Sequence, residues 1–116
     1  MILRVWRAKI VPARMEEYRH FERERYMPML RKQPGLLGML LLRQAEGYAA
    51  SLTIWEDVGA VEALQSSPSY REIARELAVS GLLAGNESVE GLEVEGGDLR
   101  PEAMMRTLER TRRAGS

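Results

Sequence analysis

The chain has 116 residues, of which 45% are hydrophobic and 29% are charged, a composition typical of one globular domain. Its 17 basic and 17 acidic residues cancel, which argues against a dedicated nucleic-acid-binding protein. With no cysteine and one histidine, thiolate chemistry and multi-histidine metal sites are excluded within one chain, and no apolar run approaches a membrane span. Arg4 and Arg7 interrupt any signal-peptide core. We therefore expect a cytoplasmic protein without nucleic-acid or membrane partners, metal or cofactor.

The first third of the chain predicts a strand followed by a helix. Residues 2–11 mix β-branched and aromatic residues with charges, and both alternating faces carry apolar groups, so both should be partly buried. Residues 12–32 have the apolar spacing of an amphipathic helix that starts at a proline. The pair Pro34-Gly35 breaks that helix.

A β-hairpin should follow. Residues 36–44 form a short, leucine-rich run that we interpret as a strand buried on both faces. Glu46 and Gly47 provide the turn, and residues 48–55 alternate as the returning strand.

Two helices are predicted after the hairpin, each with its own N-terminal cap. Asp57 should cap a helix ending near residue 65, and Ser67, which precedes a proline, should cap the next helix. The second helix has the most regular amphipathic pattern of the chain, formed by Tyr70, Ile73, Ala74, Leu77, Ala78 and Gly81.

The C-terminal part divides into a last strand and a tail. The second helix is expected to end at Gly85, and residues 88–95 should form the strand. A Gly-Gly pair then separates a domain over residues 1–96 from a tail over residues 97–116. Residues 101–113 of the tail can form an extra helix, with an acid at its start and arginines at its end.

The order strand-helix-strand-strand-helix-strand predicts an α+β, ferredoxin-like fold with an antiparallel sheet. Such a sheet carries its helices on one face, yet the first two strands are apolar on both faces. A body of this length has a limited core of its own. We therefore predict a homodimer that buries the two bare sheet faces against each other.

Several short motifs resemble, in order and spacing, those of the antibiotic biosynthesis monooxygenase family, the dimeric α/β barrels. These motifs are the Pro12 turn, Pro34-Gly35 before a leucine-rich strand, Thr53-Ile54-Trp55-Glu56-Asp57, and Ser67-Pro68-Ser69-Tyr70. The resemblance covers about residues 2–95 and leaves the tail outside. It implies one pocket per protomer between sheet and helices. Some members of the family oxygenate aromatic polyketides or quinols with O2 and no metal or flavin, others degrade haem, and others have no known activity.

The haem-degrading branch does not match this chain at its functional positions. That branch uses an asparagine, a tryptophan and a histidine ligand, which the resemblance aligns with Trp6, Leu64 and Ala74. Alanine cannot ligate iron, and His20, the only histidine of the chain, lies on a different element and on the polar face of its helix.

Candidate ligand-binding residues lie on the first and third strands. Trp6 occupies the pocket-side position of the family and can stack on a flat substrate or donate its indole N–H to an oxyanion; core packing is the alternative. Arg4 shares its face and can hold a substrate anion. Ser51 and Thr53 share a face of their strand and can hydrogen-bond a ligand, or simply fill a half-buried strand.

Glu22 and Arg25 are the candidate catalytic residues, because they fall within the apolar stripe of the first helix. Three residues apart, they can pair with each other at the rim of the helix–sheet interface. In a catalytic role, Glu22 would remove a substrate proton, and Arg25 would stabilise the resulting enolate or phenolate.

Two functions follow from these observations. The first is a cofactor-independent monooxygenase that acts on a small aromatic or quinol-like substrate with O2. The second is a non-catalytic homodimer of the same fold that binds a small ligand or serves in stress responses.

Overall fold

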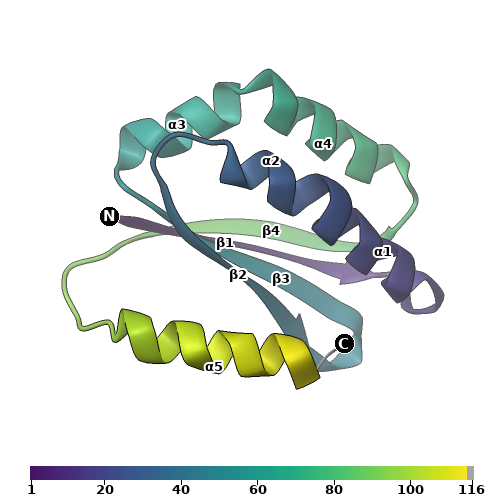
Figure 1. Ribbon diagram of the computed structural model, residues 1–116. Helices are drawn as coiled ribbons and strands as arrows, with labels where there is room; N and C mark the ends of the chain where they lie inside the picture. Colours follow the sequence, from purple (N-terminus) through teal and green to yellow (C-terminus); the bar gives the residue numbers. More distant parts are fainter. Residues whose placement is uncertain (115–116) are drawn as a thin grey trace.

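A computed structural model describes residues 1–114 as a four-stranded antiparallel sheet and the helices around it. The strands, in the spatial order β2–β3–β1–β4, are β1 (Ile2–Ile10), β2 (Leu36–Gln44), β3 (Tyr48–Trp55) and β4 (Leu83–Glu93). The helical segments are η1 (Pro12–Arg14), α1 (Met15–Phe21), η2 (Glu22–Tyr26), α2 (Met27–Arg31), η3 (Ala45–Gly47), α3 (Val58–Ser66), α4 (Pro68–Val79) and α5 (Pro101–Ala114). Segments α1 to α4 cover one face of the sheet, and α5 lies on the opposite side (Figure 1). The predicted ferredoxin-like fold is confirmed; the domain boundary at residue 96 stays a prediction.

The first long helix contains one widened turn. Residues 22–26 form a π-helical turn, closed by a hydrogen bond from the Met27 N–H to the Glu22 carbonyl. Pro28 follows directly; it has no N–H to donate, and its ring would collide with the carbonyl of Glu24 in a regular α-helix. The wider turn relieves that collision and adds one residue to the turn. The regular α-helix expected from the sequence therefore gives wrong directions for the side chains that follow residue 22.

Strand β2 lies at an edge of the sheet, which corrects one sequence expectation. We expected residues 36–44 to be buried on both faces, but the side chains of this strand are half-buried or exposed, with Leu37 55% and Leu42 41% exposed. Within residues 1–114, β3 is the one strand that pairs with it. The face of the sheet that points away from α1–α4, hereafter the outer face, has α5 as the helix on its side (Figure 1).

Both predicted helix caps are confirmed. Asp57 Oδ1 accepts a hydrogen bond from the Ala60 N–H at 2.8 Å, and Ser67 Oγ accepts one from the Tyr70 N–H at 3.4 Å. Each side chain satisfies a backbone donor that the first helical turn leaves free. The caps fix where α3 and α4 begin, and so how the apolar sides of both helices meet the sheet.

The predicted end of α4 is wrong. The helix ends at Val79 rather than at Gly85, because Gly81 adopts a positive φ of 78° and turns the chain. Strand β4 then starts at Leu83, which pairs with Ile10, five residues earlier than predicted. Gly85 lies instead within β4, beside a register irregularity opposite Lys9.

The core lies between the inner face of the sheet and α1–α4. One cluster is centred on the fully buried Trp55 and includes Leu30, Leu64 and Ile73. A second cluster joins Ile10 and Tyr18 to Ala49 and Leu82. Along β1 and β3, every second side chain points toward the helices, as expected for a sheet with one covered face.

Gly35 is the tightest backbone position of the core. It has a φ of 83°, and a Cβ added there would lie 2.5 Å from the Ala60 Cβ. We expect Gly35→Ala to lower the free energy of unfolding by about 2–4 kcal/mol, since left-handed strain and overpacking add. Urea unfolding measures the loss. The control, Gly91→Ala, adds a methyl group with nothing within 4 Å; equal effects of both variants would contradict the prediction.

Within residues 1–114, no helix is long and apolar enough to cross a bilayer.

Candidate functional site

A cavity of about 100 Å³ lies between the inner face of the sheet and the helices, where the two core clusters meet. It is lined by Arg4, Trp6, Tyr18, Phe21, Tyr26, Tyr70, Ile73, Ala74, Leu77, Ala78, Leu83 and Glu87. Five of these side chains are aromatic. A cavity of this size and lining suits a single aromatic ring rather than a larger polycycle. We call it the aromatic cavity.

Arg4 brings a positive charge to the wall of the aromatic cavity. Its side chain comes from the middle of β1 and is only 8% exposed. Its guanidinium donates to the Tyr70 hydroxyl at 3.1 Å, and its Cζ lies 5.6 Å from the centre of the Tyr70 ring. Among residues 1–114, no carboxylate lies within salt-bridge distance of this group. A buried cation without a counter-ion is costly, and a bound anion would offset that cost.

Trp6 forms the adjacent part of the wall. Its ring lies nearly parallel to that of Tyr18, with 6.2 Å between centroids and 16° between planes. The indole N–H donates to Glu87 Oε1 of β4 at 3.0 Å. Trp6 packs against the cluster that contains Ile10 and Tyr18, as the core-packing alternative expects, and it also lines the cavity. The indole N–H is already donated to Glu87, whose side chain is exposed at the cavity.

Glu22 lies directly behind the cavity wall. It is 6% exposed, and its charge acts on the Tyr18 hydroxyl, a group of the cavity wall. Burial raises the pKa of the Tyr18 hydroxyl, and the Glu22 charge raises it further. Tyr18 therefore remains protonated and can donate to the carboxylate. Tyr18 lines the cavity and Glu22 does not, so Glu22 can act on the cavity only through a neighbouring side chain.

Burial raises the pKa of Glu22 to about 7 from an ordinary value near 4.5. The hydrogen bond with Tyr18 and the charges of Arg19, Arg23 and Arg43 oppose this rise and do not cancel it. A carboxyl group with this pKa is deprotonated in about half of the molecules at neutral pH, and its carboxylate is a stronger base than that of an exposed glutamate. The predicted base thus has a suitable pKa and an indirect route to the cavity.

Ser51 and Thr53 lie beneath the cavity and do not line it. Ser51 is 1% exposed, and its hydroxyl is 3.0 Å from the Tyr26 hydroxyl, so it positions a ring of the cavity wall. Thr53 Oγ1 accepts from the Trp55 indole N–H at 2.8 Å and donates to the Arg4 carbonyl at 3.4 Å. Both hydroxyls are hydrogen-bonded within the protein, and neither lines the cavity.

Arg25 lies on the surface, away from the aromatic cavity. Its guanidinium donates to Glu76 of α4 at 2.8 Å and lies 4.0 Å from Glu72, with 47% of its side chain exposed. The expected Arg25–Glu22 pair is not formed. The π turn explains this difference. In a regular α-helix, Arg25 would point toward the cavity, but the extra residue in the turn places Tyr26 there instead.

We therefore expect Arg25→Met to have little effect on stability or on ligand chemistry. The ion pair with Glu76 is exposed, and exposed pairs contribute little to stability. The thermal unfolding midpoint should stay within error of the parent, and any turnover should stay within about twofold. A large loss of turnover with an unchanged midpoint would place Arg25 in the chemistry after all.

The positions compared with the haem-degrading branch give no iron ligand. Ala74 lines the aromatic cavity, Leu64 belongs to the core, and His20 is exposed on α1. Across residues 1–114, no three metal-ligating side chains come together.

Comparisons with known proteins support the fold and the family. Among solved structures, a protein of unknown function from Nitrosomonas europaea is 14% identical, with a TM-score of 0.70 over 85% of this chain and 93% of that chain. A protein from Mycobacterium tuberculosis is 18% identical, with a TM-score of 0.70 over 84% and 98%. A candidate antibiotic biosynthesis monooxygenase from Caulobacter crescentus is 21% identical, with a TM-score of 0.70 over 82% and 90%. At these identities the likeness shows the fold alone.

A search of curated proteins found no match. The sequence profile of the antibiotic biosynthesis monooxygenase family matches residues 1–76, which include β1, the π turn, the β2–β3 hairpin and most of α4. This match covers more than half of the chain and agrees with the resemblance seen in its motifs. The chain belongs to the antibiotic biosynthesis monooxygenase family.

Proposed function

We propose that this protein is a monooxygenase that uses O2, without metal or organic cofactor, to oxidise a small phenol or quinol bound as its anion. One observation carries the proposal: Arg4 is buried on the wall of an aromatic cavity with no carboxylate partner within residues 1–114. A phenolate would supply the missing negative charge, and its ring would stack on Trp6.

The proposed chemistry needs a base to form the anion. Tyr18 would accept the proton of the substrate hydroxyl while passing its own proton to the Glu22 carboxylate, so that one proton moves and Tyr18 ends neutral. Arg4 would stabilise the oxyanion. An electron-rich ring carbon that bears one hydrogen would then add O2, and the resulting peroxide anion would take the proton held by Glu22 to give a hydroperoxide. Loss of water, which includes the hydrogen of that carbon, leaves a carbonyl group. O2 is the oxidant, with one oxygen atom retained and one released as water.

Oxygen uptake by the purified, chelator-treated protein tests this function. The substrates are single-ring quinols and phenols, because of the cavity size, with protein-free reactions to subtract autoxidation. We expect saturable uptake that survives the chelator. Quenching of tryptophan fluorescence measures binding separately, since Trp6 lines the cavity. Saturable binding without uptake above autoxidation would contradict the monooxygenase and favour the non-catalytic ligand-binding protein.

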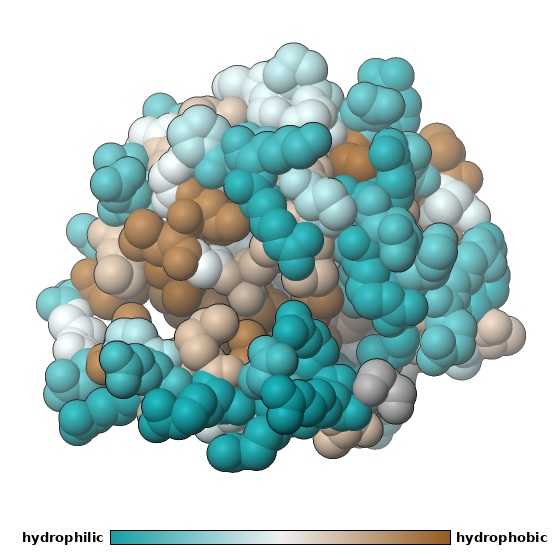
Figure 2. All heavy atoms as spheres, in the orientation of Figure 1, coloured by the Kyte–Doolittle hydropathy of each residue, from teal (hydrophilic) through white to brown (hydrophobic). Residues whose placement is uncertain are grey.

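We also propose that the protein forms a homodimer through the outer face of the sheet. Leu42 and Leu92 on this face are more than 40% exposed, and Figure 2 shows apolar residues gathered over the sheet between the upper helices and α5. An exposed apolar area of this kind marks an interaction site. Sedimentation equilibrium should give twice the 13.2 kDa mass of one chain; the mass of a single chain would contradict the dimer.

A further inference from the structure

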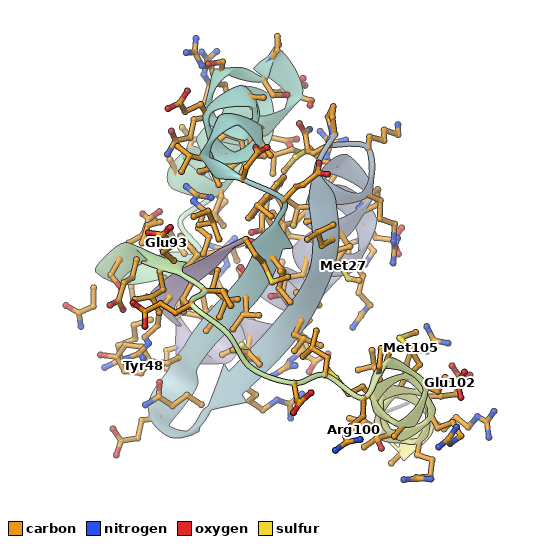
Figure 3. All side chains as sticks on the ribbon, turned by 90° about the vertical axis from the view of Figure 1, so that its left-hand side faces the viewer. Met27, Tyr48, Glu93, Arg100, Glu102 and Met105 are labelled. Atoms are coloured by element: carbon orange, nitrogen blue, oxygen red, sulfur yellow. The ribbon has the colours of Figure 1, made fainter. Side chains whose placement is uncertain are left out.

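The mouth of the aromatic cavity lies between α4 and the edge strand β4. Among the residues that line the cavity, the exposed ones are Ala74 and Ala78, one turn apart on α4, and Glu87 on β4. Figure 3 shows the end of β4, at Glu93, on the side of the molecule away from α5, and no residue of α5 lines the cavity. The opening to solvent is therefore framed by two alanine methyl groups and one carboxylate.

A β-bulge holds Glu87 at this mouth. Where β1 has Ala8 alone, β4 has two residues, Asn86 and Glu87, so the register shifts there. Asn86 has a positive φ of 56°, and its side-chain amide donates to the Tyr48 hydroxyl at 3.1 Å. Glu87 points to the inner face, where its Oε1 accepts the Trp6 indole N–H at 3.0 Å. Bulges of this kind redirect side chains and are common beside functional sites.

The aromatic cavity has opposite charges at its two ends. Arg4 is buried at one end, and Glu87 is exposed at the other, opposite Ala8 in the strand register. Ala8 is four residues from Arg4 along β1, about 13 Å at 3.3 Å per residue, and Trp6 lies between them. Within residues 1–114, neither charge has a salt-bridge partner. A ring bound against Trp6 would have one end at a cation and the other at a carboxylate.

We propose that the aromatic cavity selects a single-ring phenol that carries a protonated amine opposite its hydroxyl group, and that Glu87 recognises the amine. The phenol oxygen lies at Arg4, the ring lies against Trp6, and the ammonium group stays at the mouth. A carboxylate can accept about four hydrogen bonds, and the Trp6 N–H is the one side-chain donor to Glu87 within residues 1–114. An ammonium group suits it better than a neutral hydroxyl, because charge attraction adds to the hydrogen bond. This inference rests on the phenol site of the proposed function and names its substrate class.

Titration calorimetry with three phenols of equal size tests the proposal without relying on turnover. The ligands are 4-(aminomethyl)phenol, 4-(hydroxymethyl)phenol and 4-ethylphenol, which place an ammonium, a hydroxyl and a methyl group at the same position. Near neutral pH and at low salt, the amine should bind about tenfold more tightly than 4-ethylphenol, the combined effect of an exposed ion pair and a cation–π contact with Trp6. The alcohol should bind with intermediate affinity. High salt should reduce the preference for the amine, because the mouth is exposed.

Glu87→Gln separates recognition of the amine from support of Trp6. The amide oxygen of glutamine can still accept the Trp6 N–H, so the ring keeps its partner while the charge is lost. The variant should bind the amine about tenfold more weakly and 4-ethylphenol within about twofold of the parent. The matched control is Glu90→Gln, which removes the same charge from the outer face of β4 and should leave all three affinities unchanged.

The outcomes distinguish this inference from the proposed function. A preference for the amine that is lost in Glu87→Gln and kept in Glu90→Gln supports the inference. Equal affinities for the three phenols, equal affinities for the amine and the alcohol, or a preference that survives Glu87→Gln overturns it and leaves the phenol site intact. If none of the phenols binds the unmodified protein, the phenol site and the inference both fail. Selective binding of the amine without oxygen uptake contradicts the monooxygenase alone.

Discussion

Arg4→Met should reduce oxygen uptake with the best phenol or quinol by about 10²- to 10³-fold, the usual loss when one preorganised donor to a developing oxyanion is removed. Methionine keeps the length and apolar contacts of the side chain and removes only the charge and its hydrogen bonds. The same change removes a buried cation whose side chain, among residues 1–114, has the Tyr70 hydroxyl as its one hydrogen-bond partner. The thermal unfolding midpoint should therefore stay unchanged or rise while activity falls.

Arg31→Met is the matched control, because Arg31 is exposed at the end of α2. It should preserve both uptake and substrate affinity. The two readouts together distinguish a site residue from a structural one. If Arg4→Met lowers the midpoint sharply, the guanidinium is chiefly structural, and if it leaves uptake unchanged, the proposed anion site is wrong.

Glu22→Gln should abolish a pH dependence of stability that the unmodified protein shows between about pH 4.5 and pH 7. Below pH 4.5 the carboxyl group is protonated in both the folded and the unfolded chain. Between the two pKa values only the folded chain keeps the proton, so the free energy of unfolding falls as the pH rises. The difference between 4.5 and about 7 corresponds to a loss of about 3 kcal/mol by pH 8.

Urea unfolding of both proteins at several pH values measures this effect. Glutamine cannot ionise, so the variant should be about 2–3 kcal/mol more stable than the parent at pH 8 and similar to it at pH 4. If Glu22 is also the base, oxygen uptake should fall by about 10²- to 10⁴-fold. Glu24→Gln changes an exposed glutamate two residues away and should alter neither quantity. Parallel pH profiles of Glu22→Gln and the parent would show that Glu22 does not carry the effect.

Taken together, these two variants assign different tasks to two buried charges. Arg4 faces the aromatic cavity and has no salt-bridge partner within residues 1–114, whereas Glu22 does not line the cavity and is proposed to act through Tyr18. The solved structures of similar fold share at most 21% identity with this chain among those compared above. Fold similarity at that level does not transfer a site, so the reaction must be tested on these residues themselves.

Local features of the sequence predicted most of the fold. Asp57 and Ser67 mark helix starts because a short polar side chain can satisfy the first free N–H groups wherever the helix lies. Alternation placed Trp6 and Arg4 on one face of β1, and both line the cavity. These are properties of a few neighbouring residues, and the surrounding structure does not change them.

The rest of the site depended on contacts between distant segments. A regular α-helix would place Arg25 beside Glu22, but because of the π turn before Pro28, Arg25 lies on the surface. Pro28 inside a helical pattern was the signal for this, yet the sequence does not show whether a proline ends, kinks or widens a helix. Likewise, the leucines of β2 predicted burial, and only the strand order shows that β2 is an edge. Local patterns specify which side chains share a face; which face is covered, and what meets across it, is decided by packing over long sequence separations.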